Sequence, residues 1–255
     1  MGARAVVATE WWKRSWEFRR HWHRYRVEGL EHFHAVGGAV MVGYHGRPVA
    51  HDLCMLQVGL LREGVRTHAV VHEVAKTLPV VRHALGPMGC VFGDGPEVEA
   101  ALEEGRKIIV TPGGTRESAR RHDVRYRVDW GGRTGWLRLA LKHRVPVLPV
   151  GAWGVDDTYV GLVNGAHYID KIKLPGGLPP WLGVGPLGLW PLSPPFPVRI
   201  TSVIAPPYTR HLDAAVDPAD RRALGDMARE VEAIVQGILD RRPRWAGPRS
   251  GRDAS

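Results

Sequence analysis

The sequence predicts a single α/β domain in which a mainly parallel or mixed sheet is covered by helices on both faces. Short, continuously apolar runs alternate with segments of helical spacing along most of the chain. Strands without polar alternation are typical of sheets that are buried on both faces. At 255 residues the chain is near the upper size for one hydrophobic core. We expect this domain over residues 26–240, a basic helix over 1–25 and a disordered basic tail over 241–255.

The individual elements follow from local composition. In residues 96–104, Pro96 at the start and Gly105 after the end are helix start and stop signals. Runs of β-branched residues favour strands. The predicted strands are residues 39–44, 67–72, 90–92, 107–111, 145–150 and 198–204. The predicted helices are residues 52–62, 80–88, 96–104, 135–142 and 218–240.

An N-terminal segment, residues 10–26, combines aromatic and cationic side chains. Drawn as a helix, it places Trp11, Phe18 and Trp22 on one stripe, which Trp12 and Trp16 flank. Such rings beside Lys and Arg suit the interface between membrane and water. The same rings are equally suited to packing on the protein's own core, and both interpretations remain open at this point.

The charge of the chain indicates an anionic partner. Lys and Arg number 35 against 26 Asp and Glu, a net charge of +9, which favours nucleic acid or an anionic bilayer. No zinc finger, RNP-like stretch or Gly-rich basic repeat is present, so we expect membrane lipids and no nucleic acid. No apolar run is long enough to span a bilayer.

The cellular location follows from the N-terminus and the cysteines. Charges interrupt the N-terminal segment throughout, which is unlike a signal peptide. Cys54 and Cys90 lie in apolar stretches, and we expect both to be reduced. These features predict a cytoplasmic protein that is peripheral on the inner face of the membrane.

The first candidate site follows the predicted strand 39–44, because sites in such sheets lie at the carboxyl ends of strands. His45 comes directly after this strand, and Asp52 stands at the predicted N-cap of the next helix. A carboxylate bonded to one imidazole nitrogen leaves the other nitrogen to take a proton from a hydroxyl. His45 and Asp52 are therefore candidate catalytic residues, with helix capping as the alternative role of Asp52.

The second candidate site follows the predicted strand 107–111. Gly113 and Gly114 allow a ligand to approach the backbone, whose amides can face an anion. Thr115, Arg116 and Glu117 follow, and the fork of the arginine suits phosphate or carboxylate. No Gly-Lys-Ser/Thr follows, so this is not a phosphate-binding P-loop. The alternative is an ordinary turn that carries a surface ion pair.

A metal centre is not expected. The pairs His21/His23 and His32/His34 have no Cys-x-x-Cys or His-Glu-x-x-His beside them. The first pair lies on the basic helix, where contact with lipid explains it better.

Three blocks in order resemble the glycerolipid acyltransferase superfamily, which includes the lysophosphatidic acid and glycerol-3-phosphate acyltransferases. The agreement covers residues 26–207. The Pro-Gly-Gly-x-x-Glu form of the second block and the downstream Trp-Gly-Gly are similar to the diacylglycerol-acyltransferase-like branch. The blocks are His45 to Asp52, Pro112 to Glu117 with Trp130 to Gly135, and Val145 to Val150.

The resemblance implies that His45 deprotonates an acceptor hydroxyl, which attacks an acyl thioester directly. Gly113, Gly114 and Arg116 would then steady the oxyanion or a substrate phosphate. Acyl-CoA or an acyl carrier protein would be the co-substrate, with no cofactor and no metal. This sequence departs from the family in two places. Six residues separate His45 from Asp52 where four are usual, and Gly113 replaces the usual Glu.

The acceptor is expected to be a lipid alcohol. The carboxylate of Glu117 would repel a phosphate monoester, which favours a neutral acceptor such as a mono- or diacylglycerol. Arg116 could instead bind that phosphate, which would make the protein a lysophosphatidic acid acyltransferase that forms phosphatidic acid.

A non-catalytic lipid-binding protein on the same scaffold is a further alternative. A serine hydrolase is excluded because no Gly-x-Ser-x-Gly is present. The sequence indicates no oligomeric state.

Residues 178–197 carry no charge, and their proline content predicts no regular element. Three roles are open for them: a wall of an acyl-chain groove, a segment that dips into the bilayer, or a loop that covers the core.

Overall fold

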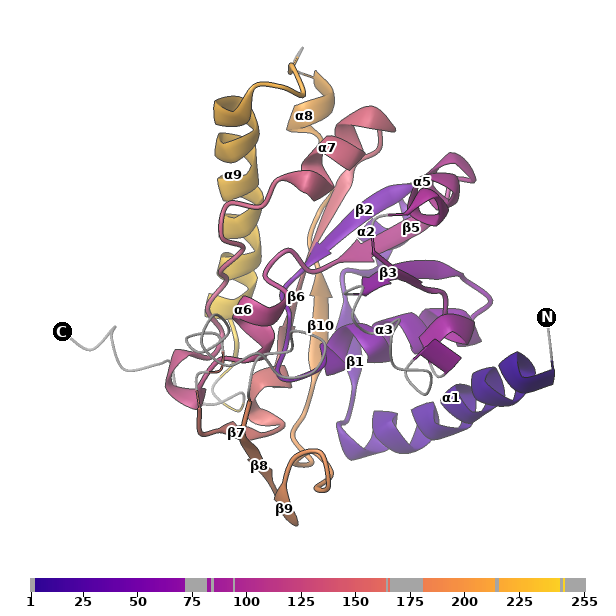
Figure 1. The fold of residues 1–255 in the computed structure, drawn as a ribbon, viewed down its shortest axis with the longest axis vertical. Coiled ribbons are helices and arrows are strands. Elements are labelled where there is room, and N and C mark those ends of the chain that lie inside the picture. Colours follow the sequence, from indigo (N-terminus) through magenta and orange to yellow (C-terminus); the bar gives the residue numbers. More distant parts are fainter. Residues whose placement is uncertain are drawn as a thin grey trace.

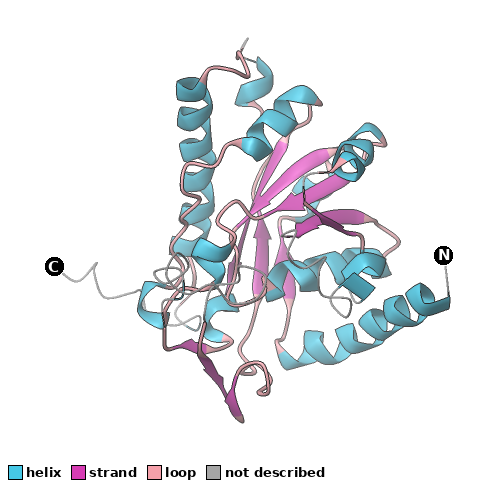
Figure 2. Ribbon diagram, in the orientation of Figure 1, coloured by secondary structure: helices cyan, strands magenta, loops and turns pink. Residues whose placement is uncertain are grey.

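A seven-stranded mixed sheet forms the centre of the protein, with helices on both faces (Figure 1, Figure 2). The strand order is β1-β10-β6-β2-β5-β3-β4. Strands β2 to β6 are parallel to their neighbours among themselves, whereas β10 is antiparallel to β6 and β1 is parallel to β10. This arrangement confirms the predicted fold class. The computed structural model describes residues 3–71, 82–83, 85–93, 95–163, 165, 181–213, 216–243 and 245.

The strands of the central sheet lie close to their predicted positions, except that the three-residue edge strand β1 was not predicted, because its ends are exposed and it forms no apolar run. Strand β6 differs, because it continues past Val150 to pair with β10 through Gly151. A Cβ at Gly151 would lie 2.8 Å from Ile238 Cγ2, so this position lets the last helix pack closely. The strands are β1 (Arg26–Glu28), β2 (Ala39–Gly43), β3 (Thr67–Val71), β4 (Cys90–Phe92), β5 (Lys107–Val110), β6 (Val147–Trp153) and β10 (Thr201–Ile204).

The two faces of the sheet are covered by different helices. Alternate residues of β2 enter different cores: Val40 and Val42 pack with α5, α7 and α9, whereas Ala39 and Met41 pack with α2 and α3. Every residue of β2 is buried, as expected for the centre of a covered sheet. The helices are α2 (Leu30–His34), α3 (His51–Arg62), α5 (Pro96–Glu103), α6 (Thr115–Ser118), α7 (Gly135–Lys142), α8 (Arg210–Asp213) and α9 (Arg221–Asp240).

Two predicted segments lie partly outside the described residues. Residues 80, 81 and 84 of the predicted helix 80–88 lie outside the described residues, and Gly86–Met88 forms a 3₁₀ turn. Most of the tail predicted over 241–255 also lies outside them.

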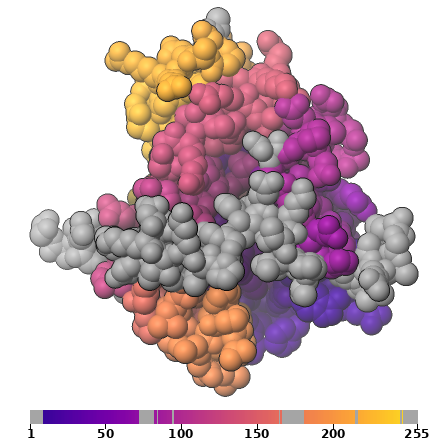
Figure 3. Space-filling view, viewed as in Figure 1, coloured from indigo at the N-terminus to yellow at the C-terminus, as the bar shows by residue number. Residues whose placement is uncertain are grey.

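A second, small sheet lies apart from the first. It is built from β7 (Val160–Gly161), β8 (Gly183–Gly185) and β9 (Gly188–Leu189), which pair antiparallel. The prediction that residues 178–197 hold no regular element was wrong, because glycines at 183, 185 and 188 permit the tight pairing. In the space-filling view this orange segment forms the lower edge of the molecule (Figure 3).

The N-terminal helix α1 (Ala3–Trp22) lies against α3, and its aromatic residues are divided between the contact with the body and the surface. Trp12 is buried, and Trp16 donates its ring N–H to the Met55 carbonyl at 3.1 Å. On the outer side, Trp11 is 54% exposed and Phe18 is 66% exposed. One side of α1 therefore packs on the body, and the other leaves aromatic rings in solvent.

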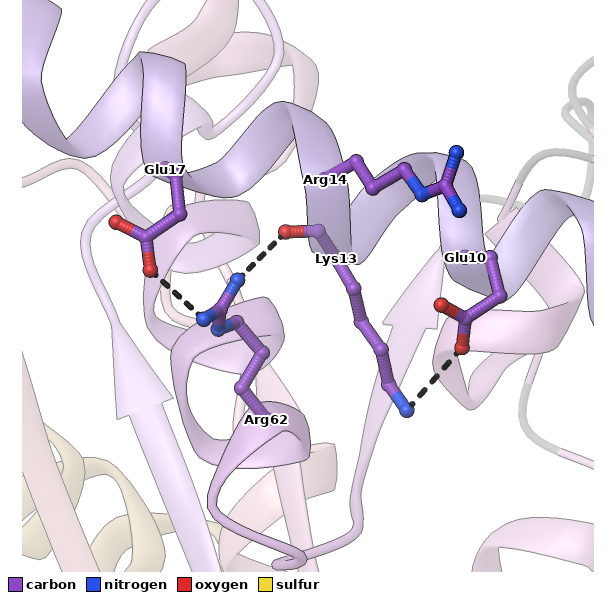
Figure 4. A pocket seen from close by; sticks show the side chains of 5 residues that line it. All are labelled: Glu10, Lys13, Arg14, Glu17 and Arg62. Atoms are coloured by element: carbon purple, nitrogen blue, oxygen red, sulfur yellow. Dashed lines mark hydrogen bonds and ion pairs between the residues drawn. The ribbon is translucent and has the colours of Figure 1, made fainter.

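A surface hollow between α1 and α3 is lined by charged side chains, most of which pair with one another (Figure 4). Arg62 of α3 bonds the Lys13 carbonyl at 2.8 Å and pairs with Glu17 at 2.7 Å. These contacts attach α1 to α3, and the hollow contains none of the candidate site residues. None of the described helices is both long and apolar enough to cross a membrane.

Candidate active site

The loops that follow β2, β5 and β6 meet at one edge of the sheet. These three strands are parallel neighbours, so their carboxyl ends lie together. Several contacts join the loops. The His45 N–H donates to Glu117 Oε2 at 2.8 Å, and the Tyr44 hydroxyl donates to Asp156. The two candidate sites, which only the family resemblance had assigned to one reaction, therefore lie side by side in the structure.

His45 is partly buried, and its environment fixes which nitrogen carries the proton. Nδ1 lies 3.0 Å from the Gly46 carbonyl oxygen. A carbonyl can only accept, so Nδ1 is the protonated nitrogen and Nε2 is left as the base. Burial lowers the pKa of His45 to about 4, partly opposed by that carbonyl. The imidazole is therefore neutral near pH 7.

Asp52 lies close to the loop of His45 but does not bond the imidazole. The residue is buried, and a Cβ at Gly46 would lie 2.8 Å from its Oδ1. Among the described residues no side chain bonds either carboxylate oxygen, and the nearby Asp52 and Leu53 N–H groups make no hydrogen bond of full geometry to them. The predicted N-cap position was wrong, because Ala50, with φ 49°, caps α3 and Asp52 stands in its first turn.

The pKa of Asp52 predicts how stability should depend on pH. Burial raises it from 3.8 to about 7, against the opposing effect of the Asp52 and Leu53 amides. The folded state thus binds more protons than the unfolded state between these values, and stability falls as the pH rises through this window. Replacing Asp52 with Asn removes this loss, so the variant should gain several degrees in Tm relative to the native protein at pH 8 and little at pH 4. Thermal unfolding at both pH values measures this, and an equal difference at both would contradict it.

The side chain of Glu117 fills the space next to the Gly113 backbone, where a side chain at position 113 would otherwise lie. A Cβ at Gly113 would lie 2.0 Å from Glu117 Cδ, so the carboxylate fills the place of a side chain at 113. Glu117 is fully buried; its Oε1 accepts the Asp129 N–H at 2.8 Å, while Oε2 accepts the His45 N–H. Burial raises the pKa of Glu117 to about 7, opposed by Arg120 and these two amides. The residue predicted to contact substrate is instead in the interior, directly behind His45.

The outer side of the turn carries Arg116. Its guanidinium bonds both oxygens of Asp129, at 3.1 and 2.9 Å, and not Glu117. The Gly114 and Arg116 amides donate to the Thr111 and Gly113 carbonyls, so these two N–H groups close the turn. Gly114 has φ 49° and ψ −127°, a conformation that favours glycine. Thr115 is half-buried beside them.

A buried ionic network underlies the site and was not predicted from the sequence. Arg47, fully buried in the loop after β2, pairs with Asp156 at 3.7 Å and donates to the Arg120 carbonyl at 3.2 Å. Arg120 in turn donates to the Tyr44 hydroxyl at 2.7 Å. Burial alone would raise the pKa of Asp156, but Arg47 and Arg120 outweigh it and hold that pKa below its usual value. The network ties the loops after all three strands together.

The sequence held a signal for part of this network. Asp156 follows β6, and sites in such sheets lie at the carboxyl ends of the strands. Nothing in the sequence marked Asp156 as a partner of Arg47. No group of three His, Cys, Asp or Glu side chains suited to a metal occurs in the part of the chain that the structure describes.

Comparison with known proteins identifies the class to which this site belongs. An acyltransferase family model matches residues 24–153, just over half of the chain and a range that includes His45 and Glu117. The chain belongs to this acyltransferase family, and the resemblance that the three blocks indicated is confirmed.

Individual relatives agree with this assignment. A Bos taurus protein named "DGAT1/2-independent enzyme synthesizing storage lipids" is 24% identical over 251 residues, covering 96% of this chain and 67% of the relative. A Gallus gallus protein with the same name is 28% identical over 191 residues, covering 74% and 53%. An uncharacterized protein of Mycobacterium tuberculosis is 26% identical over 229 residues, covering 88% and 63%. The chain thus spans about two thirds of the bovine relative and about half of the chicken one.

Proposed function

We propose that the protein transfers a fatty acyl group from an acyl thioester, acyl-CoA or acyl carrier protein, to the hydroxyl of a glycerolipid or another lipid alcohol. The observation that carries this proposal is the neutral His45 imidazole at the carboxyl edge of the sheet. Its Nδ1 proton is held by the Gly46 carbonyl, so Nε2 is the nitrogen that can accept a proton. The acyltransferase family supports the same chemistry.

In the proposed reaction, Nε2 of His45 takes the proton of the acceptor hydroxyl as its oxygen attacks the thioester carbonyl. The carbon–sulfur bond then breaks, and the departing thiolate takes the proton from the imidazolium. A thiol with a pKa of about 8–9 leaves easily, by analogy with cysteine. The Gly46 carbonyl stabilises the imidazolium by accepting from Nδ1. Asp52, close to this loop, adds negative charge when it is ionised.

Substrate contact is assigned to the outer side of the turn. Gly113 is covered by Glu117, and the Gly114 and Arg116 amides are used within the turn. Thr115 and the guanidinium of Arg116 remain as groups that can meet the thioester oxygen or the donor's phosphates. Arg116 would exchange or share its partner Asp129 to do so.

We propose a neutral lipid alcohol as the acceptor. Repulsion of phosphate by Glu117 no longer supports this choice, because that carboxylate is buried. Two other observations do. The carboxylate of Asp129 already holds the fork of Arg116, which leaves less positive charge for a phosphate monoester. In addition, the names of the vertebrate relatives describe synthesis of storage lipids.

Competition between diacylglycerol and lysophosphatidic acid, with labelled acyl-CoA as donor, tests this proposal. We expect triacylglycerol to predominate among the labelled products. Predominant phosphatidic acid would contradict the neutral acceptor and leave acyl transfer standing. No labelled lipid with any acceptor would favour the non-catalytic lipid-binding alternative.

A further inference from the structure

An apolar tip projects from the small sheet. It consists of the turn between β8 and β9 and the residues that follow, here called the β8–β9 tip (residues 186–192). Leu187 is 81% exposed, Leu189 51% and Leu192 93%. No charged residue occurs from 178 to 197. Figure 1 shows β8 and β9 extending below the main sheet, and Figure 3 shows the same orange segment at the lower edge of the surface.

The tip is held in a defined conformation. Ser193, which is buried, accepts the Leu187 N–H through Oγ at 3.0 Å, and the Tyr159 hydroxyl donates to its carbonyl at 2.9 Å. A Cβ at Gly185 would lie 2.4 Å from the Pro194 carbonyl oxygen, so the two sides of the tip are in close contact. The leucines are therefore presented outward by a packed base.

The C-terminal end of α1 contacts the residues that directly follow this tip. The Trp22 ring N–H donates to the Pro195 carbonyl at 3.1 Å, and Phe18 stacks on Trp22 with ring centroids 5.6 Å apart. The chain after Trp22 continues beside the stretch that leads from the tip into β10, because the Arg26 N–H donates to the Ile200 carbonyl at 3.1 Å. Arg24 and Arg26 are exposed in this part of the chain, and so is Arg20, which pairs with Glu17 at 3.3 Å. Apolar side chains and arginines thus share one edge of the molecule.

We propose that the β8–β9 tip inserts into an anionic bilayer, with Phe18 and these arginines beside it at the headgroups. Leucines on a convex tip cannot enclose an acyl chain, but they can enter the boundary of the acyl region. Arginines next to them match the negative surface of the leaflet. A second copy of the chain would bury the leucines but would bring like-charged arginines together.

The tip is also connected to the active site. The Trp181 ring lies against Trp190 and Tyr159, with centroids 5.8 and 6.2 Å apart, and its N–H donates to the Arg120 carbonyl at 3.1 Å. Arg120 belongs to the network under His45 and pairs with Glu117 at 3.7 Å. Docking through the tip therefore sets the orientation of the site toward the bilayer. Only this last step rests on the proposed function.

The test replaces Leu187, Leu189 and Leu192 together with Ser in the full chain. Binding is measured by co-sedimentation with phosphatidylglycerol–phosphatidylcholine vesicles, without acyl donor, so its outcome is independent of catalysis. We expect the partition coefficient to fall at least about tenfold, because three apolar side chains no longer enter the acyl boundary. The matched control replaces the same three leucines with Met and should bind as the native protein does. High salt should weaken binding of the native protein.

Circular dichroism and gel filtration accompany the test. If the triple Ser variant fails to fold, Leu192→Ser alone, at the most exposed position, replaces it. Unchanged vesicle binding by the Ser variant overturns the proposal, and so does an equal loss with Met. A native dimer that the Ser substitutions dissociate, with vesicle binding unchanged, would assign the tip to contact between copies and overturn it as well.

Discussion

Replacing His45 with Ala should reduce kcat by at least about a hundredfold while the protein remains folded. A general base contributes roughly 10²–10⁴ in rate, and His45 is the imidazole whose Nε2 is left as a base at the carboxyl edge of the sheet. The side chain is partly exposed and its Nδ1 bonds only the adjacent Gly46 carbonyl, so its loss should cost little stability. Turnover and thermal unfolding of the same preparation measure both effects.

The pH profile provides the control for this prediction. Because burial holds the pKa of His45 at about 4, the imidazole is the neutral base throughout the range above pH 5. When kcat/KM is plotted against pH, the fall at low pH that is due to protonation of His45 should therefore have its midpoint well below the usual histidine pKa of about 6.5. Near-native turnover by a folded His45→Ala protein would remove His45 as the base.

Replacing Glu117 with Gln should lower kcat about tenfold or more and leave KM less changed. The carboxylate accepts two backbone N–H groups, from His45 and Asp129, each at 2.8 Å. An amide can accept only on its oxygen, so one N–H would face an NH₂ group, and an unsatisfied buried donor costs about 1–3 kcal/mol. The loop that carries His45 should then shift. Glu117 acts as a positioning residue, which steady-state kinetics of the folded variant can show.

A double-mutant cycle with Gly113 separates this role from general destabilisation. Gly113→Ala alone should be damaging, because its Cβ would lie 2.0 Å from Glu117 Cδ. In a Glu117→Ala background the space is empty, so the same Gly113→Ala change should cost much less. Additive effects on kcat and Tm would show that the two positions do not share this space.

The sequence predicted the inner strands of the central sheet well because they are buried on both faces, whereas the exposed edge strand β1 was missed. An uninterrupted apolar run such as residues 39–43 has few other stable environments, and the carboxyl-end rule then placed His45 and the 112–118 turn together. The second sheet escaped prediction because prolines hide a pairing that depends on glycines at 183, 185 and 188. Local spacing also misplaced Asp52, since Ala50 in a left-handed conformation caps α3.

The roles within the site were harder to predict than its position. Glu117 and Arg116 are adjacent in sequence, and only the structure shows that one is inside and the other outside. Arg47 and Asp156 are far apart in the chain, and charged residues are rarely buried unless paired. No pattern in one sequence identifies such a partner. Long-range pairing of this kind depends on the completed fold.

The central claim is tested most directly by measuring thiol release from acyl-CoA with and without a lipid alcohol, using native protein and His45→Ala in parallel. We expect release to depend on the lipid acceptor, to match the ester formed mole for mole, and to fall at least about a hundredfold in the variant. Release that is independent of acceptor, or equal in both proteins, would contradict acyl transfer by His45.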